Sequence, residues 1–238
     1  MHREKDISIV VPAFNEEKNL EDTIDMIEGL FADWKDYEIL IVDDGSKDQT
    51  LDIAHKRAAS SDKIRVIIHH KNLGRGTALN RGFNEARFEY LISINAKKDT
   101  CIRELSKIIE KLGCADLVLS YQLNSNERPV FRYFLSVLYL KFVNTLFGLN
   151  LKYYNGSSII PKKLFESTSI KTTGYAYETE LLVSLLKKKH TYCEVGVVDI
   201  FEKGRRSRAF RFKNIVSVFF VLVRLFFKMT ILKKNTNA

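Results

Sequence analysis

Cysteine and proline are scarce in this sequence of 238 residues. The three cysteines, Cys101, Cys114 and Cys193, are odd in number, and no two of them have the Cys-x-x-Cys spacing. The sequence therefore predicts neither a disulfide framework nor a zinc site, and we expect all three to be reduced thiols. The three prolines are scattered, and no Pro/Gly/Ser-rich linker or repeat divides the chain. Such a chain suits one domain with a short appendage.

An apolar leader is also missing, because residues 1–12 (MHREKDISIVVP) lack the h-region of a signal peptide. We expect the chain to stay in the cytoplasm. The net charge of +9 is unevenly spread, since residues 201–238 hold ten basic residues and one acid, and the rest is about neutral. A basic end on a neutral body predicts an anionic partner, either nucleic acid or an anionic lipid surface.

Short β-branched runs alternate with longer helix-like segments in the first half of the chain. Near-continuous apolar strands separated by helices indicate an α/β fold, with a mostly parallel sheet covered by helices on both faces. The strand candidates are 7–11, 37–43, 64–69, 90–95 and 115–120, and the helix candidates lie near 16–32, 48–61, 75–88 and 101–113.

Ligands bind such sheets beyond the carboxyl ends of the strands, where this chain has small, polar and acidic residues. After the first strand, Asn15 is a candidate N-cap, with Glu16 in the first turn of the helix. After the second strand, Asp43 and Asp44 place two carboxylates side by side. Adjacent acids repel one another, which favours a ligand-binding role in which they accept hydrogen bonds from a base N–H or ribose hydroxyls.

The turn after the third strand is rich in glycine. Residues 71–83 (KNLGRGTALNRGF) combine three glycines with Lys71 and Arg75. This pattern predicts a backbone that closely approaches a phosphate-bearing ligand, although a Gly-x-Gly alone is a weak signal.

Three motifs in order resemble the N-terminal half of family 2 glycosyltransferases with the GT-A fold: residues 9–17 (IVVPAFNEE), 38–50 (EILIVDDGSKDQT) and 71–83. Within that family the chain is most similar to the dolichol- and polyprenyl-phosphate sugar synthases, over roughly residues 6–200. The resemblance implies a nucleotide-sugar site made of Pro12, Ala13, Phe14, Glu16, Asp43, Asp44, Arg75, Asn95, Ala96 and Lys97.

The fourth motif departs from the family pattern of Asp-Ala-Asp, whose acids hold a divalent metal on the pyrophosphate. Asn95 and Lys97 stand at the two acidic positions, and a charged lysine has no lone pair for Mg²⁺ or Mn²⁺. Three interpretations stay open. Lys97 or Lys98 replaces the metal as fixed positive charge, Asp99 still holds Mg²⁺ or Mn²⁺ weakly with Asn95, or the chain only binds. We favour the first, because the local charge has changed from acidic to basic.

An apolar helix is predicted over residues 127–147, with Arg132 and Ser136 four positions apart on one stripe. In polyprenyl-phosphate sugar synthases, an arginine and a serine at this spacing grip the lipid phosphate. The resemblance therefore implies an acceptor-phosphate site of Arg132 and Ser136, with Arg128 as a helper. It also identifies residues 153–166 as the glycine-containing acceptor loop. The alternative is a buried helix with a satisfied polar seam.

Two further segments resemble the family less closely. Residues 174–190 predict a helix whose early acids, Glu178 and Glu180, are candidate catalytic bases for a hydroxyl acceptor; a lipid phosphate, being already ionised, needs none. Residues 201–210 loosely resemble the basic stretch near the diphosphate, with Arg208 as a candidate phosphate ligand. The candidate catalytic residues are therefore Lys97, Asp99, Arg132, Ser136 and Glu178.

The tail, residues 213–234, is an apolar run interrupted by Arg224 and Lys228. Each charge costs about 2.5–3.5 kcal/mol at a bilayer centre, so we expect an amphipathic helix lying in the interface rather than a span. Its basic side, which includes Arg224 and Lys228, would face the lipid headgroups, opposite the stripe of Phe219, Leu222, Phe226 and Met229. A core-packing or dimer-forming helix is the alternative.

The sequence thus predicts a GT-A domain over residues 1–210 and a membrane-associating tail over 211–238. The predicted reaction is an inverting sugar transfer from a nucleotide-diphosphate sugar to a polyprenyl phosphate, on the inner face of a membrane. Transfer to a glycan hydroxyl and a non-catalytic nucleotide-sugar-binding protein are the alternatives. No nucleic acid is expected as a partner, because the basic tail is interleaved with an apolar stripe.

Overall fold

The structure is a computed structural model in which residues 5–97, 101–200 and 212–236 are described. One seven-stranded sheet has the strand order β3-β2-β1-β4-β6-β5-β7. Every neighbouring pair is parallel except the two pairs made by β6, which runs antiparallel to β4 and β5. The strands are β1 (Ile7–Ala13), β2 (Tyr37–Asp43), β3 (Ile64–Ile68), β4 (Tyr90–Ser93), β5 (Leu117–Gln122), β6 (Ser158–Pro161) and β7 (Tyr192–Val197).

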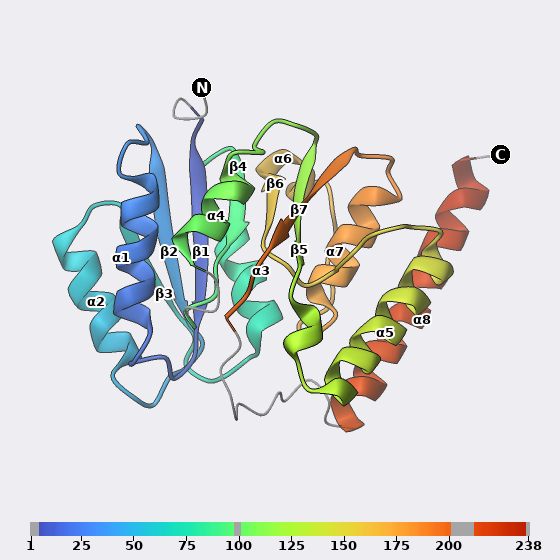
Figure 1. Ribbon diagram of the computed structural model, residues 1–238, viewed down its shortest axis with the longest axis horizontal. Coiled ribbons are helices and arrows are strands. Elements are labelled where there is room, and N and C mark those ends of the chain that lie inside the picture. The colour runs from blue at the N-terminus through green and yellow to red at the C-terminus, as the bar shows by residue number, and fades with distance from the viewer. Residues whose placement is uncertain (1–4, 98–100, 201–211, 237–238) are drawn as a thin grey trace.

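Helices cover both faces of this sheet (Figure 1). The alternation along β1 shows the two layers: Ile7, Ile9 and Val11 pack with α1 and α4, whereas Val10 packs with α3 and α7. The helices are α1 (Leu20–Phe31), α2 (Thr50–Ser60), α3 (Arg75–Glu85), α4 (Ile102–Ile109), α5 (Val130–Phe147), α6 (Lys162–Glu166), α7 (Tyr177–Leu186) and α8 (Phe212–Thr236), with a 3₁₀ turn η1 (Ser125–Glu127) before α5. The mixed α/β architecture predicted from the sequence is confirmed.

Strands β6 and β7 were not predicted from the sequence. Both strands are short, and β6 has only four residues. β7 completes the sheet beside β5, where Val118 lies opposite Cys193. This pairing also brings together Cys114 and Cys193, which form a disulfide across 79 positions of sequence with a Cα–Cα distance of 6.6 Å. The expectation that all three cysteines are reduced is therefore wrong for Cys114 and Cys193, whereas Cys101 is free and exposed. Cysteines that meet because their segments are neighbours in a sheet need no characteristic spacing in the sequence, so the disulfide could not be predicted.

The long helices α5 and α8 pack side by side at one end of the molecule (Figure 1). Leu222 and Leu225 of α8 are buried in the same apolar cluster as Val143 and Phe147 of α5. The expected direction of the basic side of α8 is wrong. Arg224 and Lys228 turn toward the protein, where Arg224 pairs with Glu180 and Lys228 donates to the Ser169 carbonyl. The wheel placed Leu222 and Arg224 on different sides, but both contact the domain: Leu222 packs in the apolar cluster, and the long, partly exposed side chain of Arg224 reaches Glu180.

Phenylalanines occupy the outer side of α8 in place of the basic residues. Phe219, Phe220, Phe226 and Phe227 are between 39% and 65% exposed. On α5, Val130, Phe131, Phe134, Leu138 and Phe142 are between 46% and 83% exposed. We call these nine residues the apolar face. By length and composition, α5 could also cross a membrane, and 11% of this helix is buried inside the protein.

Candidate functional site

Two adjacent acids at the end of β2 have different surroundings. Both carboxylate oxygens of Asp44 have partners. Its Oδ1 accepts the Leu73 N–H at 2.9 Å and lies 2.8 Å from His69 Nδ1, and its Oδ2 accepts the Gly74 N–H at 2.8 Å. Asp44 therefore holds the loop between β3 and α3 in place. Gly45, with φ of 74°, fits beneath that loop, since a Cβ there would lie 2.6 Å from the Lys71 backbone.

Asp43 has an unused carboxylate oxygen. Only 1% of the residue is exposed, and its Oδ2 accepts the Ser46 N–H at 3.1 Å. Its Oδ1 is buried and, among the described residues, has no hydrogen-bond partner. A buried acceptor without a partner costs free energy in the free protein. The geometry thus suits a ligand N–H that would complete this carboxylate.

The loops after β1 and β2 are bound to each other. Asn15, with a positive φ of 55°, accepts the Lys47 N–H on its Oδ1 and donates its own backbone N–H to Ser46 Oγ. The neighbouring Glu16 is 5% exposed and its N–H donates to Thr50 Oγ1 at 2.8 Å. Helix α1 begins only at Leu20 with Asn19 before it, so the expectation that Asn15 caps this helix is wrong. Asn15 joins two loops instead, next to Pro12, Ala13 and Phe14 at the end of β1.

A cluster of one arginine, one asparagine and one glutamate lies where β4 ends. Arg75, the first residue of α3, donates from Nε to Asn95 Oδ1 at 3.1 Å, and its guanidinium pairs with Glu178 of α7. Three residues predicted from separate parts of the sequence therefore meet. Ala96 is buried beneath them, and Lys97 is exposed at the rim. Because Glu178 is already paired with an arginine, it is poorly suited to take a proton as a general base.

The described residues at this motif do not fit a divalent metal. Asn95 offers a neutral oxygen, and that oxygen faces the Arg75 guanidinium. Within the described ranges, no three His, Cys, Asp or Glu side chains gather in a way that could hold an ion. Lys98, Asp99 and Arg208, which the sequence analysis named as candidates, lie outside the described residues.

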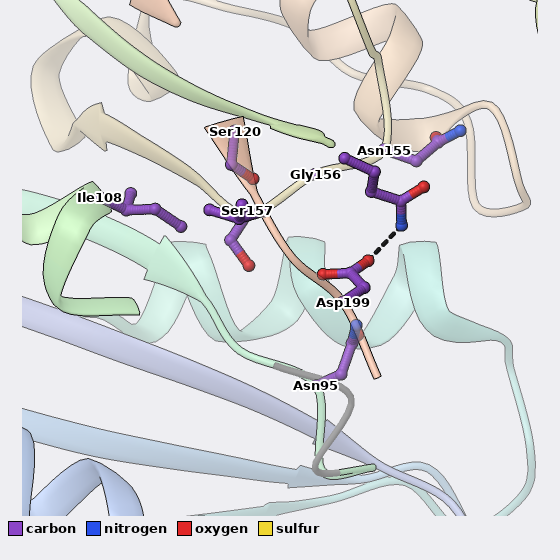
Figure 2. A pocket seen from close by; sticks show the side chains of 9 residues that line it. Asn95, Ile108, Ser120, Asn155, Gly156, Ser157 and Asp199 are labelled. Carbon is purple, nitrogen blue, oxygen red and sulfur yellow. Dashed lines mark hydrogen bonds between the residues drawn. The ribbon is translucent and has the colours of Figure 1, made fainter. Parts of the chain in front are cut away.

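A polar pocket opens beside Asn95 (Figure 2). Its lining comes from β5, the loop before β6 and the end of β7, and the side chains of Ser157 and Asp199 are directed into it. Gln122 donates from Nε2 to Asp199, while its buried Oε1 has no partner among the described residues. We call this the amide pocket; it is lined by Asn95, Ile108, Ser120, Gln122, Asn155, Gly156, Ser157, Val197 and Asp199.

The amide pocket was missed by sequence reasoning, apart from Asn95 and the loop around Gly156. Gly156 lies so close to β5 that a Cβ would be 2.2 Å from the Ser120 carbonyl oxygen, so its backbone forms a wall of the pocket. Gln122 and Asp199 gave no signal, because they meet only through the pairing of β5 with β7.

A second pocket adjoins the first through Gln122, which lines both. It lies between α5 and the loop before β6, and Ser136, a candidate acceptor-phosphate residue, lines it. Lys152 and Tyr153 also line it, and neither was singled out from the sequence. We call this the α5 pocket; it is lined by Gln122, Ser125, Tyr133, Ser136, Val137, Leu140, Lys152 and Tyr153.

Arginines flank the α5 pocket. Arg128, 8% exposed, donates to Tyr153 Oη at 3.3 Å and lies over that ring at 5.7 Å. Burial and the neighbouring Arg128 lower the pKa of Arg132 from its usual value. Two guanidinium groups close enough to repel one another favour an anion between them. Of the predicted acceptor residues, Ser136 thus lines the pocket, Arg128 contacts its lining residue Tyr153, and Arg132 lies near enough to both Arg128 and Tyr153 to interact with their charges.

A search against protein families identifies the sequence over residues 8–163 as glycosyl transferase family 2. The chain belongs to this family. Among curated relatives, a human dolichyl-phosphate beta-glucosyltransferase is 37% identical over 117 residues, covering 46% of this chain and 36% of that protein. A dolichyl-phosphate beta-glucosyltransferase of Trichomonas vaginalis is 27% identical over 213 residues, covering 80% of this chain and 64% of that protein.

Other family 2 relatives show the same partial coverage. Glycosyltransferase AglD of Haloferax volcanii is 34% identical over 110 residues, but the match spans only 18% of that protein. The chain thus covers less than two thirds of these relatives' lengths. Glucosyl-3-phosphoglycerate synthase from Mycobacterium tuberculosis, solved with Mn²⁺, UDP-glucose and phosphoglyceric acid, has a TM-score of 0.70 at 20% identity over 94% of this chain and 79% of that one. This likeness confirms the GT-A-type fold.

Proposed function

We propose that the chain transfers a sugar from a nucleotide-diphosphate sugar to a polyprenyl phosphate at a membrane surface, with inversion. The observation that carries the proposal is the pair of adjoining pockets that share Gln122. One is polar and lies beside the Arg75–Asn95 cluster, and the other is flanked by arginines beside an exposed apolar helix. A sugar donor fits the first and a lipid phosphate fits the second.

The donor's nucleoside would bind at the ends of β1 and β2. The unused Oδ1 of Asp43 suits a base that carries an N–H, and uracil is the base that we infer because solved structures of the same fold hold UDP. Pro12, Ala13 and Phe14 form the adjoining edge. The diphosphate would extend toward Arg75 and Lys97, which supply positive charge where Asn95 and Lys97 replace the usual acids.

The sugar would occupy the amide pocket. Among the described residues, its lining has amide, hydroxyl and carboxylate groups and no lysine or arginine, which suits the hydroxyls of an uncharged hexose. Gln122 and Asp199 offer Oε1 and a carboxylate as acceptors for sugar hydroxyls.

The acceptor phosphate would lie in the α5 pocket between Arg128, Arg132 and Ser136. One of its oxygens attacks the anomeric carbon from the side opposite the diphosphate. A new bond from carbon to the phosphate oxygen forms as the bond to the diphosphate oxygen breaks, and the leaving diphosphate takes the electron pair beside Arg75. Because the attacking phosphate is already ionised, the reaction needs no protein base, consistent with the pairing of Glu178 with Arg75.

The apolar face on α5 and α8 supports a peripheral membrane position. It places exposed phenylalanines beside the α5 pocket, where a polyprenyl chain bound by its phosphate would continue into lipid. Aromatic and aliphatic side chains on interfacial helices bury themselves at the boundary of headgroups and acyl chains. The cytoplasmic side is the one on which we expect this docking.

The test compares Arg132→Ala with wild type in sugar transfer from UDP-glucose to polyprenyl phosphate. The proposal predicts a large rise in KM for polyprenyl phosphate, with the affinity for UDP unchanged. Lys141→Ala, a change to an exposed lysine on the same helix, is the matched control. Unchanged KM for polyprenyl phosphate in an active Arg132→Ala enzyme would exclude this acceptor site.

A further inference from the structure

Two acids in the first turn of α7 point in different directions. Glu178 pairs with Arg75, at the start of α3 in the donor site. Glu180 points away from that site and accepts Arg224 Nη2 of α8 at 2.8 Å. One turn of helix therefore lies between the donor site and the helix that carries half of the apolar face.

Glu180 is held in a closely packed site. Only 1% of it is exposed, and it also accepts the Thr172 N–H at 3.0 Å and the Thr172 hydroxyl. Arg224 donates to the same hydroxyl oxygen at 2.9 Å. A buried carboxylate needs such partners, so removing the guanidinium would leave its charge uncompensated. Arg224, Glu180 and Thr172 thus form a three-residue cluster between α8 and the loop before α7.

The loop before α7 packs directly against the first turn of α3. A Cβ at Gly76 would lie 2.6 Å from the Thr173 carbonyl oxygen and 2.8 Å from that of Gly174. The backbone of residues 173–174 therefore sits against the first turn of α3, one residue from Arg75. A shift of the loop would displace Arg75 or break its bonds with Asn95 and Glu178.

We propose that Arg224 and Glu180 are positioning residues, through which the seating of α8 sets the geometry of the donor site. The proposal rests on the proposed function in that Arg75 lies at the donor diphosphate. The route is continuous in packed contacts: Arg224 holds Glu180 and Thr172, Thr172 fixes residues 173–174, and these support Gly76 and Arg75. Neither Arg224 nor Glu180 touches the donor itself.

The test uses the full chain and UDP as the probe. Arg224→Ala should weaken UDP binding, measured by calorimetry, by at least about fivefold, which is the lower end of ordinary coupling between sites. Arg224→Lys, which keeps the charge, should recover part of the affinity. The matched control is Lys228→Ala on the same helix, where the lysine contacts only the Ser169 carbonyl among the interactions described for it; it should bind UDP like wild type.

Amide hydrogen exchange gives a second readout that does not depend on nucleotide. In Arg224→Ala, exchange should quicken at residues 74–78 as well as 171–178, whereas Lys228→Ala should leave both segments unchanged. Should the alanine variant fail to fold, Arg224→Gln, which keeps a donor for Glu180, is measured in its place. Faster exchange confined to α8, or unchanged UDP affinity in a folded Arg224 variant, overturns the proposal. Absence of UDP binding in the wild-type protein would count against the proposed function alone. The amide exchange at residues 74–78 would then decide whether Arg224 positions this segment.

Discussion

Asp43 and Asp44 allow a sharp test, because they are adjacent, almost equally buried and used differently. Asp43→Asn keeps the shape of the side chain and removes the charge from the oxygen that has no partner among the described residues. A hydrogen bond to a charged group contributes about 1.5–3 kcal/mol, so UDP affinity should fall about 10- to 150-fold. Stability should stay level or rise, since the free protein no longer buries a carboxylate charge on an oxygen without a partner among the described residues.

Asp44→Asn should do the reverse. Its two oxygens accept the N–H groups of Leu73 and Gly74 and contact His69. An asparagine amide would set a donor against at least one of these donors, which lowers the free energy of unfolding by at least about 1.5–3 kcal/mol. Titration calorimetry with UDP and urea unfolding of both variants make the comparison. Equal UDP affinity in folded Asp43→Asn and wild type would refute the assignment of the nucleoside site.

Three further outcomes follow from the site and the apolar face. Turnover of the preferred nucleotide sugar should survive EDTA, and Lys97→Ala should lower that turnover at least about tenfold, because a charge-assisted contact is lost. Strict dependence on Mg²⁺ or Mn²⁺, with an unimpaired Lys97→Ala variant, would contradict the interpretation that lysine replaces the metal. Gln122→Leu should lower kcat with UDP affinity unchanged; a loss of UDP affinity alone would place the sugar elsewhere. The double change Phe220→Ser and Phe227→Ser should release the protein from anionic liposomes in flotation, at about 1.5–3 kcal/mol per phenylalanine, while Ile68→Ser on the far edge strand should not. Flotation unaffected by the two serines would exclude the apolar face as the docking surface.

The sequence predicted the sheet and the edge on which its ligand-binding loops gather. This success has a physical cause, because buried parallel strands are apolar runs and their carboxyl ends must meet at one edge. Asp43, Arg75 and Asn95 were found in this way. The different surroundings of Asp43 and Asp44 could not be predicted, because they depend on which N–H groups the loop after β3 turns inward.

Contacts between distant segments were the other limit. The amide pocket needs β5 beside β7, and the disulfide depends on the same pairing. On α8, a helical wheel gives the relative directions of side chains but not which side meets the domain, so Arg224 was assigned to headgroups although it binds Glu180. Glu178 was a candidate base by its position, and its pairing with Arg75 could not be predicted from the sequence.

The most direct test of the account is transfer of radiolabel from UDP-glucose and other labelled nucleotide sugars to polyprenyl phosphate in detergent micelles, followed by organic extraction. The account predicts label in the lipid fraction only when polyprenyl phosphate is present, with the product anomer opposite to that of the donor. It also predicts that Arg132→Ala abolishes this transfer while UDP still binds. Binding of the nucleotide sugar without any label in the lipid, or transfer of label to a glycan hydroxyl instead, would contradict the central claim.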